Sequence, residues 1–473
     1  MKNLFLICFL LFFAYSCKEK IEINQESKGF EKSQLPQWAA NAVIYKVNTL
    51  QFSPDGDFAG IEAQLDRLKN MGVDILCMMP IHPVSELKRK ANGDVRVSKI
   101  STLEEGQKKL ITPYAVADYR DANMAFGGLG AFKSLVEATH AKGMKIIIDW
   151  VPNQTGWDNT WISDHSDWYT KDSLGNIISS IDYNSKNPRS WTDVASLNYD
   201  NRNMRQAMID AMVFWLTDID IDGFCVKIAH SIPQKFWDEW APVMLRAKPK
   251  AFLLAQSELP SHRNKETYHA TYGSSFHHLT NLISRGEQNA AEIHKWLEED
   301  RKKFNTGFHV HFTSNNDEKT QEGRVFDFKE DGHKALAVLS CTFDGMPLMY
   351  SGQEEVITKR LSFYTKEYIG FEQYAYAEFF QKLFELKDRN KALWNGKYGG
   401  KLTALIEHDH VIAFERKKNG DKVTVILNLS NDRQSFTIPK EIKGKELFEN
   451  QSIHWNADTA LGLEPWQYYV IEN

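Results

Sequence analysis

The chain has 473 residues, of which 42% are hydrophobic and 25% are charged, and its formal net charge is −5. This balance fits a folded protein of two or three domains, and it excludes a disordered chain, a collagen-like fibre and a protein with many membrane spans. A mildly acidic chain lacks the positive charge that binds phosphates, so we expect no nucleic-acid partner. Aromatic residues reach 12%, which is typical of a large core or of a site that stacks sugar rings.

Residues 1–16 predict a signal peptide. After a positively charged start, an apolar run from Leu4 to Phe13 is too short to span a bilayer comfortably. Small residues then lead to Cys17, in a pattern that resembles a bacterial lipoprotein signal, in which the cysteine carries the lipid. We therefore expect an exported, membrane-anchored lipoprotein, periplasmic or at the cell surface. A plain secretory signal is the alternative, and the polar residues 17–36 predict a flexible tether.

From residue 41 onwards, short apolar runs alternate with amphipathic segments, which is typical of βα units and a parallel sheet. Helical spacing predicts helices over 61–71, 129–142, 205–216 and 233–247. Apolar runs predict strands at 43–45, 73–80, 145–151, 223–228, 251–256, 269–272, 309–313 and 347–350. Eight such strands favour a (β/α)8 TIM barrel of the α/β class over a doubly wound sheet.

Two segments interrupt this alternation, a charged one over 85–112 and a Trp-rich excursion over 153–201. Both follow the carboxyl ends of strands, where barrel enzymes build their sites. Further on, alternating runs and an Asn419-Gly420 hairpin signal predict an antiparallel β-sandwich. The expected organisation is a signal peptide over 1–16, a tether over 17–36, a barrel over 37–395 and a β-sandwich over 396–473.

Seven segments, taken together and in this order, resemble the α-amylase family, glycoside hydrolase family 13. They are Ala42–Tyr45, Met79–Pro83, Tyr114–Tyr119, Asp149–Asn153, Asp222–Phe224, Phe312–Asn315 and Gly345–Glu354. The resemblance implies an amylase-like barrel and a role in α-glucan metabolism, with an α-glucan or maltooligosaccharide as ligand.

The resemblance fails at the catalytic positions. The family's chemistry needs one carboxylate to attack the anomeric carbon and one carboxylic acid to protonate the leaving oxygen. The matching residues here are Lys227 and Gln256. Three more positions of the family's site are changed and one is kept: Cys225 replaces an Arg, Gln154 and Asn316 each replace a His, and Asp317 is retained. An ammonium has no lone pair for attack and an amide has no acidic proton, so we predict a non-hydrolytic pseudoenzyme that binds α-glucan.

Tyr45 and Tyr114 match family positions that flank the sugar, and His82 matches a family position at the end of the second strand. With Asp317, they are the candidate substrate contacts, and packing at the barrel mouth is the alternative reading. We expect no cofactor and no metal; a calcium ion near Asn153, Asp193 and His230 is the weaker alternative.

Glu258 lies two residues beyond Gln256, so on a strand it would face the same way. With Asp317 it could form a carboxyl pair for an inverting glycoside hydrolase. Alternatively, Lys227 could pair with Asp317 or Glu258 and close the old catalytic centre. A third hypothesis is an interaction scaffold that binds an envelope protein partner through the barrel.

Overall fold

The computed structural model describes residues 34–88, 113–182, 189–314, 330–357 and 366–473. Eight parallel strands close into a barrel in the order β1-β11-β10-β9-β8-β7-β3-β2. These strands are β1 (Ile44–Val47), β2 (Ile75–Met78), β3 (Lys145–Trp150), β7 (Gly223–Val226), β8 (Phe252–Ala255), β9 (Ala270–Tyr272), β10 (Phe308–His311) and β11 (Gly345–Tyr350). The predicted TIM-barrel class is confirmed, and each predicted barrel strand overlaps an observed one.

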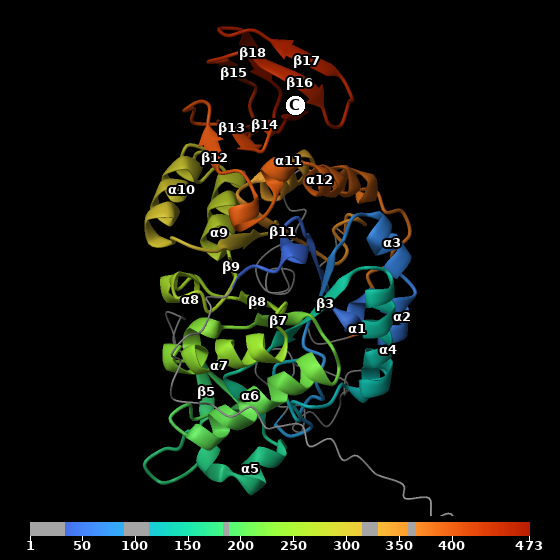
Figure 1. The fold of residues 1–473 in the computed structure, drawn as a ribbon, viewed down its shortest axis with the longest axis vertical. Helices are drawn as coiled ribbons and strands as arrows, with labels where there is room; N and C mark the ends of the chain where they lie inside the picture. The colour runs from blue at the N-terminus through green and yellow to red at the C-terminus, as the bar shows by residue number, and fades with distance from the viewer. Residues whose placement is uncertain (1–33, 89–112, 183–188, 315–329, 358–365) are drawn as a thin grey trace, which may run out of the picture.

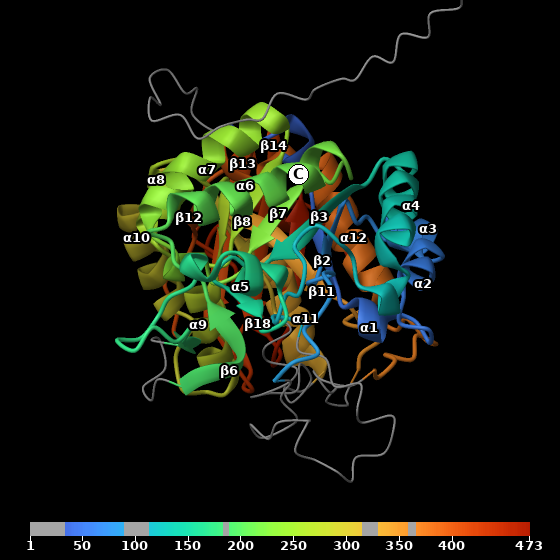
Figure 2. The same cartoon turned by 90° about the horizontal axis from the view of Figure 1, so that it is seen from below.

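Helices surround the barrel, as Figure 2 shows for α4, α6, α7 and α9. The helices are α1 (Thr49–Phe52), α2 (Phe58–Glu62), α3 (Leu65–Asn70), α4 (Gly128–Ala141), α5 (Thr160–Asp164), α6 (Arg202–Thr217), α7 (Gln234–Ala247), α8 (Pro260–Asn264), α9 (Ser274–Ser284), α10 (Glu292–Lys303), α11 (Glu330–Thr342) and α12 (Ala377–Arg389). Short 3₁₀ segments are η1 (Gln37–Ala39), η4 (Met124–Phe126), η5 (Ser166–Trp168), η6 (Ala229–Ser231), η7 (Lys391–Leu393) and η8 (Gly396–Tyr398).

The helix predicted over 61–71 is two short helices, α2 and α3, separated by Ala63 and Gln64. Its apolar residues are nevertheless buried together: Ile61, Leu65, Leu68 and Met71 are all at most 4% exposed. The hydrophobic spacing therefore predicted the buried face correctly but not the break. In the part of the chain that the structure describes, no helix is both long enough and apolar enough to cross a membrane.

Two further layers flank the barrel. The excursion after β3 holds a sheet in the order β4-β6-β5, from β4 (Gln154–Gly156), β5 (Ser179–Asp182) and β6 (Arg189–Ser196). The C-terminal region forms a six-stranded antiparallel sheet and a two-stranded one. Their strands are β12 (Leu402–Ala404), β13 (Val411–Lys418), β14 (Asp421–Asn428), β15 (Gln434–Thr437), β16 (Ile442–Glu446), β17 (Ser452–Trp455), β18 (Ala460–Leu463) and β19 (Tyr468–Glu472). In Figure 1 these C-terminal sheets lie at the top, and α5 of the excursion lies at the opposite end.

Side chains alternate between the two faces of each barrel strand. On β1, Ile44 packs in the cluster that fills the barrel, whereas Tyr45 and Val47 pack in the larger core between barrel and helices. On β7, Cys225 lies in the inner cluster, and its neighbours on either side lie in the outer core. This alternation determines which residues reach the barrel axis.

Candidate functional site

Lys227 and Gln256 lie side by side at the carboxyl ends of β7 and β8. The last residues of these strands, Val226 and Ala255, are partners in the parallel register. The Gln256 N–H then donates to the Val226 carbonyl at 2.8 Å, and the Lys227 N–H donates to the Trp150 carbonyl at 2.8 Å. Each of the two residues thus directly follows the last residue of its strand, at the mouth of the barrel.

The side chains of Lys227 and Gln256 continue the inward-facing positions of their strands. Lys227 is two residues after Cys225, and Gln256 is two residues after Leu254; both earlier residues pack inside the barrel. A period of two therefore directs both side chains toward the barrel axis at its mouth. The roles that the family resemblance implies for these positions stay predictions.

Lys227 is only 6% exposed. Among the described residues, its ammonium Nζ has no hydrogen-bond partner and forms no ion pair, and the Gln256 Oε1 is likewise buried without a partner. The ammonium lies over the ring of Tyr114, whose centroid is 5.4 Å away, within the range of a cation–π interaction. Tyr114, a predicted substrate contact, thus lies at the barrel mouth beside Lys227.

Gln154 connects this region to the loop after β3. Its Nε2 donates to the Tyr114 carbonyl at 3.3 Å, and its Oε1 accepts from the Asn153 amide at 2.8 Å. The side chain is buried, at 3% exposure. At this position the family has a titratable imidazole. This chain has an amide instead, which links the loop after β3 to the backbone at Tyr114 and has no proton to exchange near neutral pH.

Glu258 is directed elsewhere. Its carboxylate accepts hydrogen bonds from the backbone N–H of Ser275 at 3.0 and 3.1 Å and from the Ser275 hydroxyl at 2.9 Å. It thus caps the first turn of α9, where the helix dipole favours a negative charge. The hypothesis of a Lys227–Glu258 ion pair is wrong in this structure, because β8 ends at Ala255 and the chain has left the strand before Glu258. Asn316 and Asp317 lie outside the described residues.

The expectation that Tyr45 contacts a sugar needs correction. The alternation of β1 places its side chain on the outer face of the barrel, where it is fully buried. Its hydroxyl donates to Glu354 at 2.5 Å, and Arg67 pairs with the same carboxylate at 3.0 Å. Burial and the Glu354 carboxylate raise the pKa of Tyr45 well above its usual value. Tyr45 is therefore part of the packing between the barrel and its helices.

His82 also lies in the core rather than facing a ligand. Its ring makes edge-on contacts with Tyr119, Trp150 and Trp215, with centroids 5.9, 5.0 and 5.4 Å away. Neither ring nitrogen has a hydrogen-bond partner among the residues that the structure describes, and burial lowers the pKa of His82 to about 3. The imidazole behaves as a neutral aromatic ring, so the expectation of a sugar contact here is corrected to packing.

The barrel interior holds an ion pair that the sequence analysis did not single out. Lys46 donates to Asp149 at 2.8 Å and to the Tyr272 hydroxyl at 3.1 Å, and both charged side chains are fully buried. Burial alone would lower the pKa of Lys46, but the Asp149 carboxylate beside it raises the pKa well above its ordinary value. A lysine on the inner face of a short, otherwise apolar strand was the available signal.

Two cysteines approach this ion pair. Within the described residues, the ligand atoms of Cys77, Asp149 and Cys225 lie within 4.8 Å of one another. Cys225, at the position of the family's Arg, lies 3.6 Å from the Tyr272 hydroxyl. In this cluster the Lys46 ammonium supplies a positive charge next to Asp149.

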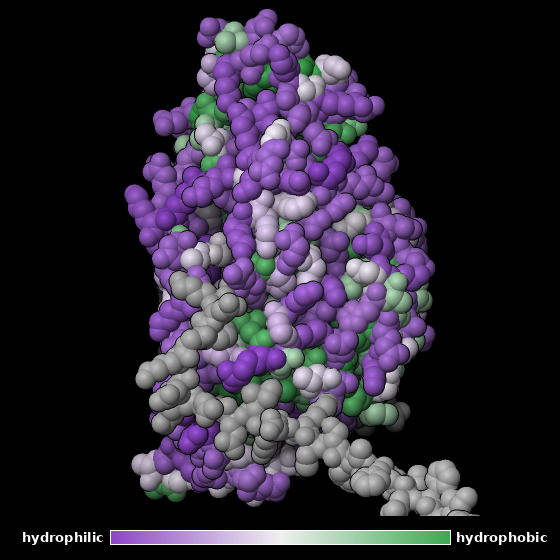
Figure 3. All heavy atoms as spheres, viewed as in Figure 1, coloured by the Kyte–Doolittle hydropathy of each residue, from purple (hydrophilic) through white to green (hydrophobic). Residues whose placement is uncertain are grey.

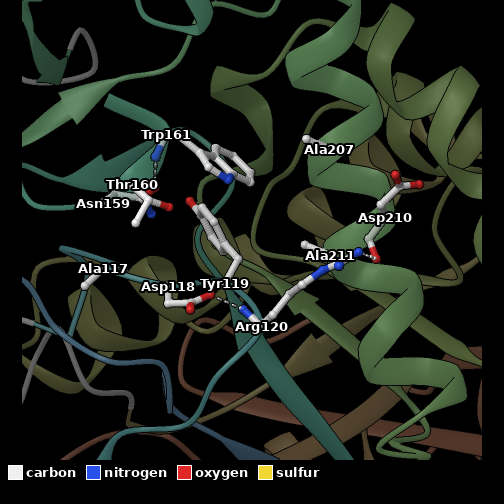
Figure 4. Close-up of a pocket in the computed structure, with 10 residues that line it drawn as sticks. All are labelled: Ala117, Asp118, Tyr119, Arg120, Asn159, Thr160, Trp161, Ala207, Asp210 and Ala211. Atoms are coloured by element: carbon white, nitrogen blue, oxygen red, sulfur yellow. Dashed lines mark hydrogen bonds between the residues drawn. The ribbon is translucent and has the colours of Figure 1, made fainter. Parts of the chain in front are cut away.

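A pocket of about 240 Å³ lies elsewhere, between the loop that ends at Arg120, the start of α5 and the helix α6 (Figure 4). Its Arg120 side chain donates to the Asp210 carbonyl at 3.2 Å, and its Trp161 ring packs 5.3 Å from Tyr119. Neither Lys227 nor Gln256 lines it. The pocket is therefore separate from the residues at the ends of β7 and β8.

Comparison with known proteins now identifies the family. Residues 26–441 match the family model described as alpha amylase, catalytic domain, so the chain belongs to the α-amylase family. Alpha-amylase 3 of Dictyoglomus thermophilum is 22% identical over 472 residues, which cover 87% of this chain and 89% of that protein. Cyclomaltodextrinase of Thermoanaerobacter pseudethanolicus is 21% identical and covers 92% of this chain and 78% of its own length.

Solved structures agree on the fold. A maltogenic α-amylase from Thermotoga neapolitana superposes with a TM-score of 0.78 at 21% identity, covering 91% of this chain and 98% of its own. An α-amylase from Lactobacillus plantarum gives 0.76 at 23% identity, covering 92% and 99%. Both similarities support a parallel eight-stranded barrel with a C-terminal antiparallel sheet.

Proposed function

We propose that this α-amylase-family protein binds α-glucan at the cell envelope without hydrolysing it, and that lipidated Cys17 anchors it to a membrane. The observation that carries the proposal is that Lys227 and Gln256 follow the ends of the neighbouring strands β7 and β8. These are the positions at which the family resemblance calls for the nucleophile and the acid.

The chemistry of these two side chains opposes hydrolysis. A carboxylate nucleophile would stabilise the oxocarbenium-like transition state, whereas the Lys227 ammonium would repel its positive charge. Gln256 cannot protonate the leaving oxygen, because an amide carries no acidic proton. The choice of α-glucan as ligand is supported by family membership and by the names of the relatives, an α-amylase and a cyclomaltodextrinase.

The alternative of a true hydrolase built on Glu258 and Asp317 is less well supported. Three hydrogen bonds from Ser275 hold the Glu258 carboxylate at the start of α9. To act as acid or base, it would have to leave these partners.

Titration of the purified chain with maltoheptaose, followed by an assay for reducing ends on the same sample, tests the proposal. We expect saturable binding and no release of reducing ends, and Tyr114→Ala should weaken binding because Tyr114 lies at the mouth beside Lys227. Tyr398→Ala, next to the C-terminal sheet, is the matched control and should bind as the wild type does. Reducing ends that disappear in Glu258→Gln or Asp317→Asn would establish the hydrolase instead.

A further inference from the structure

We propose that Lys227 binds the anionic group, a carboxylate or a phosphate, of a saccharide at the mouth of the barrel. The inference rests on the proposed function only in taking this mouth as a saccharide site. It adds that the ligand, or the part of it that reaches Lys227, carries a negative charge.

Lys227 differs from the other buried lysines of the described chain. Lys46, Lys227 and Lys387 are the lysines that are less than 9% exposed among the described residues. Lys46 pairs with a carboxylate, and Lys387 donates to the carbonyls of Gly345 and Leu393. Lys227 has neither kind of partner. Because a buried ammonium without a partner is strongly unfavourable, an anion beside Lys227 would stabilise this part of the described structure.

Two carboxylates of the described chain on neighbouring segments already have other partners. Glu258, which follows the neighbouring strand, is held by Ser275. Asp149, on the strand beside β7, is paired with Lys46 deeper in the barrel. Among the described residues, these carboxylates are thus not available to Lys227, which favours an anion from a ligand that enters at the mouth.

The groups around the Lys227 ammonium can contact a sugar. The Oε1 of Gln256, also without a partner, can accept from a sugar hydroxyl, while the three N–H groups of Lys227 donate to anionic oxygens. The Tyr114 ring, 5.4 Å from Nζ, holds the ammonium and offers a face to a sugar ring. A lysine acts as a point charge and suits a carboxylate or a phosphate, so the experiment must distinguish these two.

Isothermal titration calorimetry on the purified full-length chain tests the proposal with four probes: glucose, glucuronate, glucose 1-phosphate and maltoheptaose. We expect at least one of the two anionic sugars to bind about 10- to 100-fold more tightly than glucose, which is the usual value of a charge-assisted hydrogen bond. Lys227→Met should abolish this preference. Lys302→Met, which removes the charge of an exposed lysine on α10, is the matched control and should keep it.

Equal affinity of the neutral and anionic sugars for the wild type would overturn the proposal, and so would a preference that survives in Lys227→Met. If Lys227→Met does not fold, inorganic phosphate provides the second measurement: it should displace the anionic sugar from the wild type, and failure to do so would overturn the proposal. The maltoheptaose arm reports on the proposed function separately, since its binding requires no anion.

Discussion

At the scale of single residues, the alternation of side chains along barrel strands explains most of the site. It places Cys225 and Leu254, two residues before Lys227 and Gln256, on the inner face and Tyr45 on the outer face. The match to family motifs alone predicted that Lys227, Gln256 and Tyr45 share one site. The difference arises because a match of sequence motifs does not state which way a side chain points, and one step along a strand reverses its direction.

The Lys46–Asp149 pair should be important for stability. Replacing Lys46 by Met leaves the fully buried Asp149 carboxylate without its partner, and such a loss costs about 3–5 kcal/mol. Urea denaturation measures the free energy of unfolding. Lys46→Met/Asp149→Leu, which removes both charges, should recover part of the loss. A free energy of unfolding for Lys46→Met within about 0.5 kcal/mol of the wild type would contradict this role.

His82 should make stability fall in mild acid. Its pKa is about 3 in the folded chain against 6.5 unfolded, so below pH 6.5 the unfolded state binds a proton that the folded state does not. Stability is therefore lost as pH falls from 6.5 toward 3, by about 2 kcal/mol at pH 5 from this residue. Denaturation at pH 7 and pH 5 should show a smaller loss in His82→Phe than in the wild type. His165→Phe, at an exposed imidazole, should lose as much as the wild type, and an unchanged loss in His82→Phe would contradict the account.

At the scale of elements, one buried arginine ties the C-terminal sheet to the barrel. Arg416 of β13 donates to the carbonyls of Phe343, Trp394 and Gly400 at 2.6, 2.9 and 2.8 Å. These acceptors belong to the segment before β11 and to the connection from barrel to sheet. Because Arg416 is fully buried, water cannot replace its N–H groups as donors to these carbonyls. The C-terminal sheet is therefore held to the barrel by these hydrogen bonds.

Arg416→Met should weaken this junction. Several buried carbonyls lose their donor at once, so we expect a loss of about 2–4 kcal/mol in the free energy of unfolding, measured by urea denaturation. Arg433→Met, whose exposed ion pair with Glu464 is worth little, is the control and should stay within about 1 kcal/mol of the wild type. Equal stability of the two variants would show that Arg416 does not hold the junction.

The elements themselves were largely predictable, because apolar runs bounded by turns mark buried parallel strands. The run over 145–151, for example, became β3 with all but its first residue buried. The sequence could not predict the break between α2 and α3 or the small sheet of the excursion, since both depend on tertiary contacts. The Lys46–Asp149 pair was missed for the same reason: its members are on β1 and β3 and meet only once the barrel closes.

At the scale of the whole molecule, the described surface offers little apolar area for a protein partner. The large hydrophobic side chains exposed among the described residues are Leu87, Met124, Leu174 and Leu259, each in a different segment. Figure 3 shows a face that is mostly hydrophilic, with apolar residues in small separate groups. These observations give no support to docking through a broad apolar face of the described surface.

The lipid anchor makes a prediction for the whole chain. If Cys17 carries lipid, the wild type should fractionate with membranes and incorporate labelled palmitate, whereas Cys17→Ser should do neither. Cys8→Ser, inside the predicted signal peptide, is the control and should still be labelled. Palmitate incorporation that persists in Cys17→Ser would contradict lipidation at this residue.

The central claim is that this barrel binds α-glucan and leaves it intact, because Lys227 and Gln256 replace the two catalytic groups. Mass spectrometry of maltoheptaose recovered from its complex with the wild-type chain after prolonged incubation tests this most directly. The account predicts that the bound sugar is recovered entirely as maltoheptaose. Recovery of shortened oligosaccharides, or the absence of any bound sugar, would contradict it.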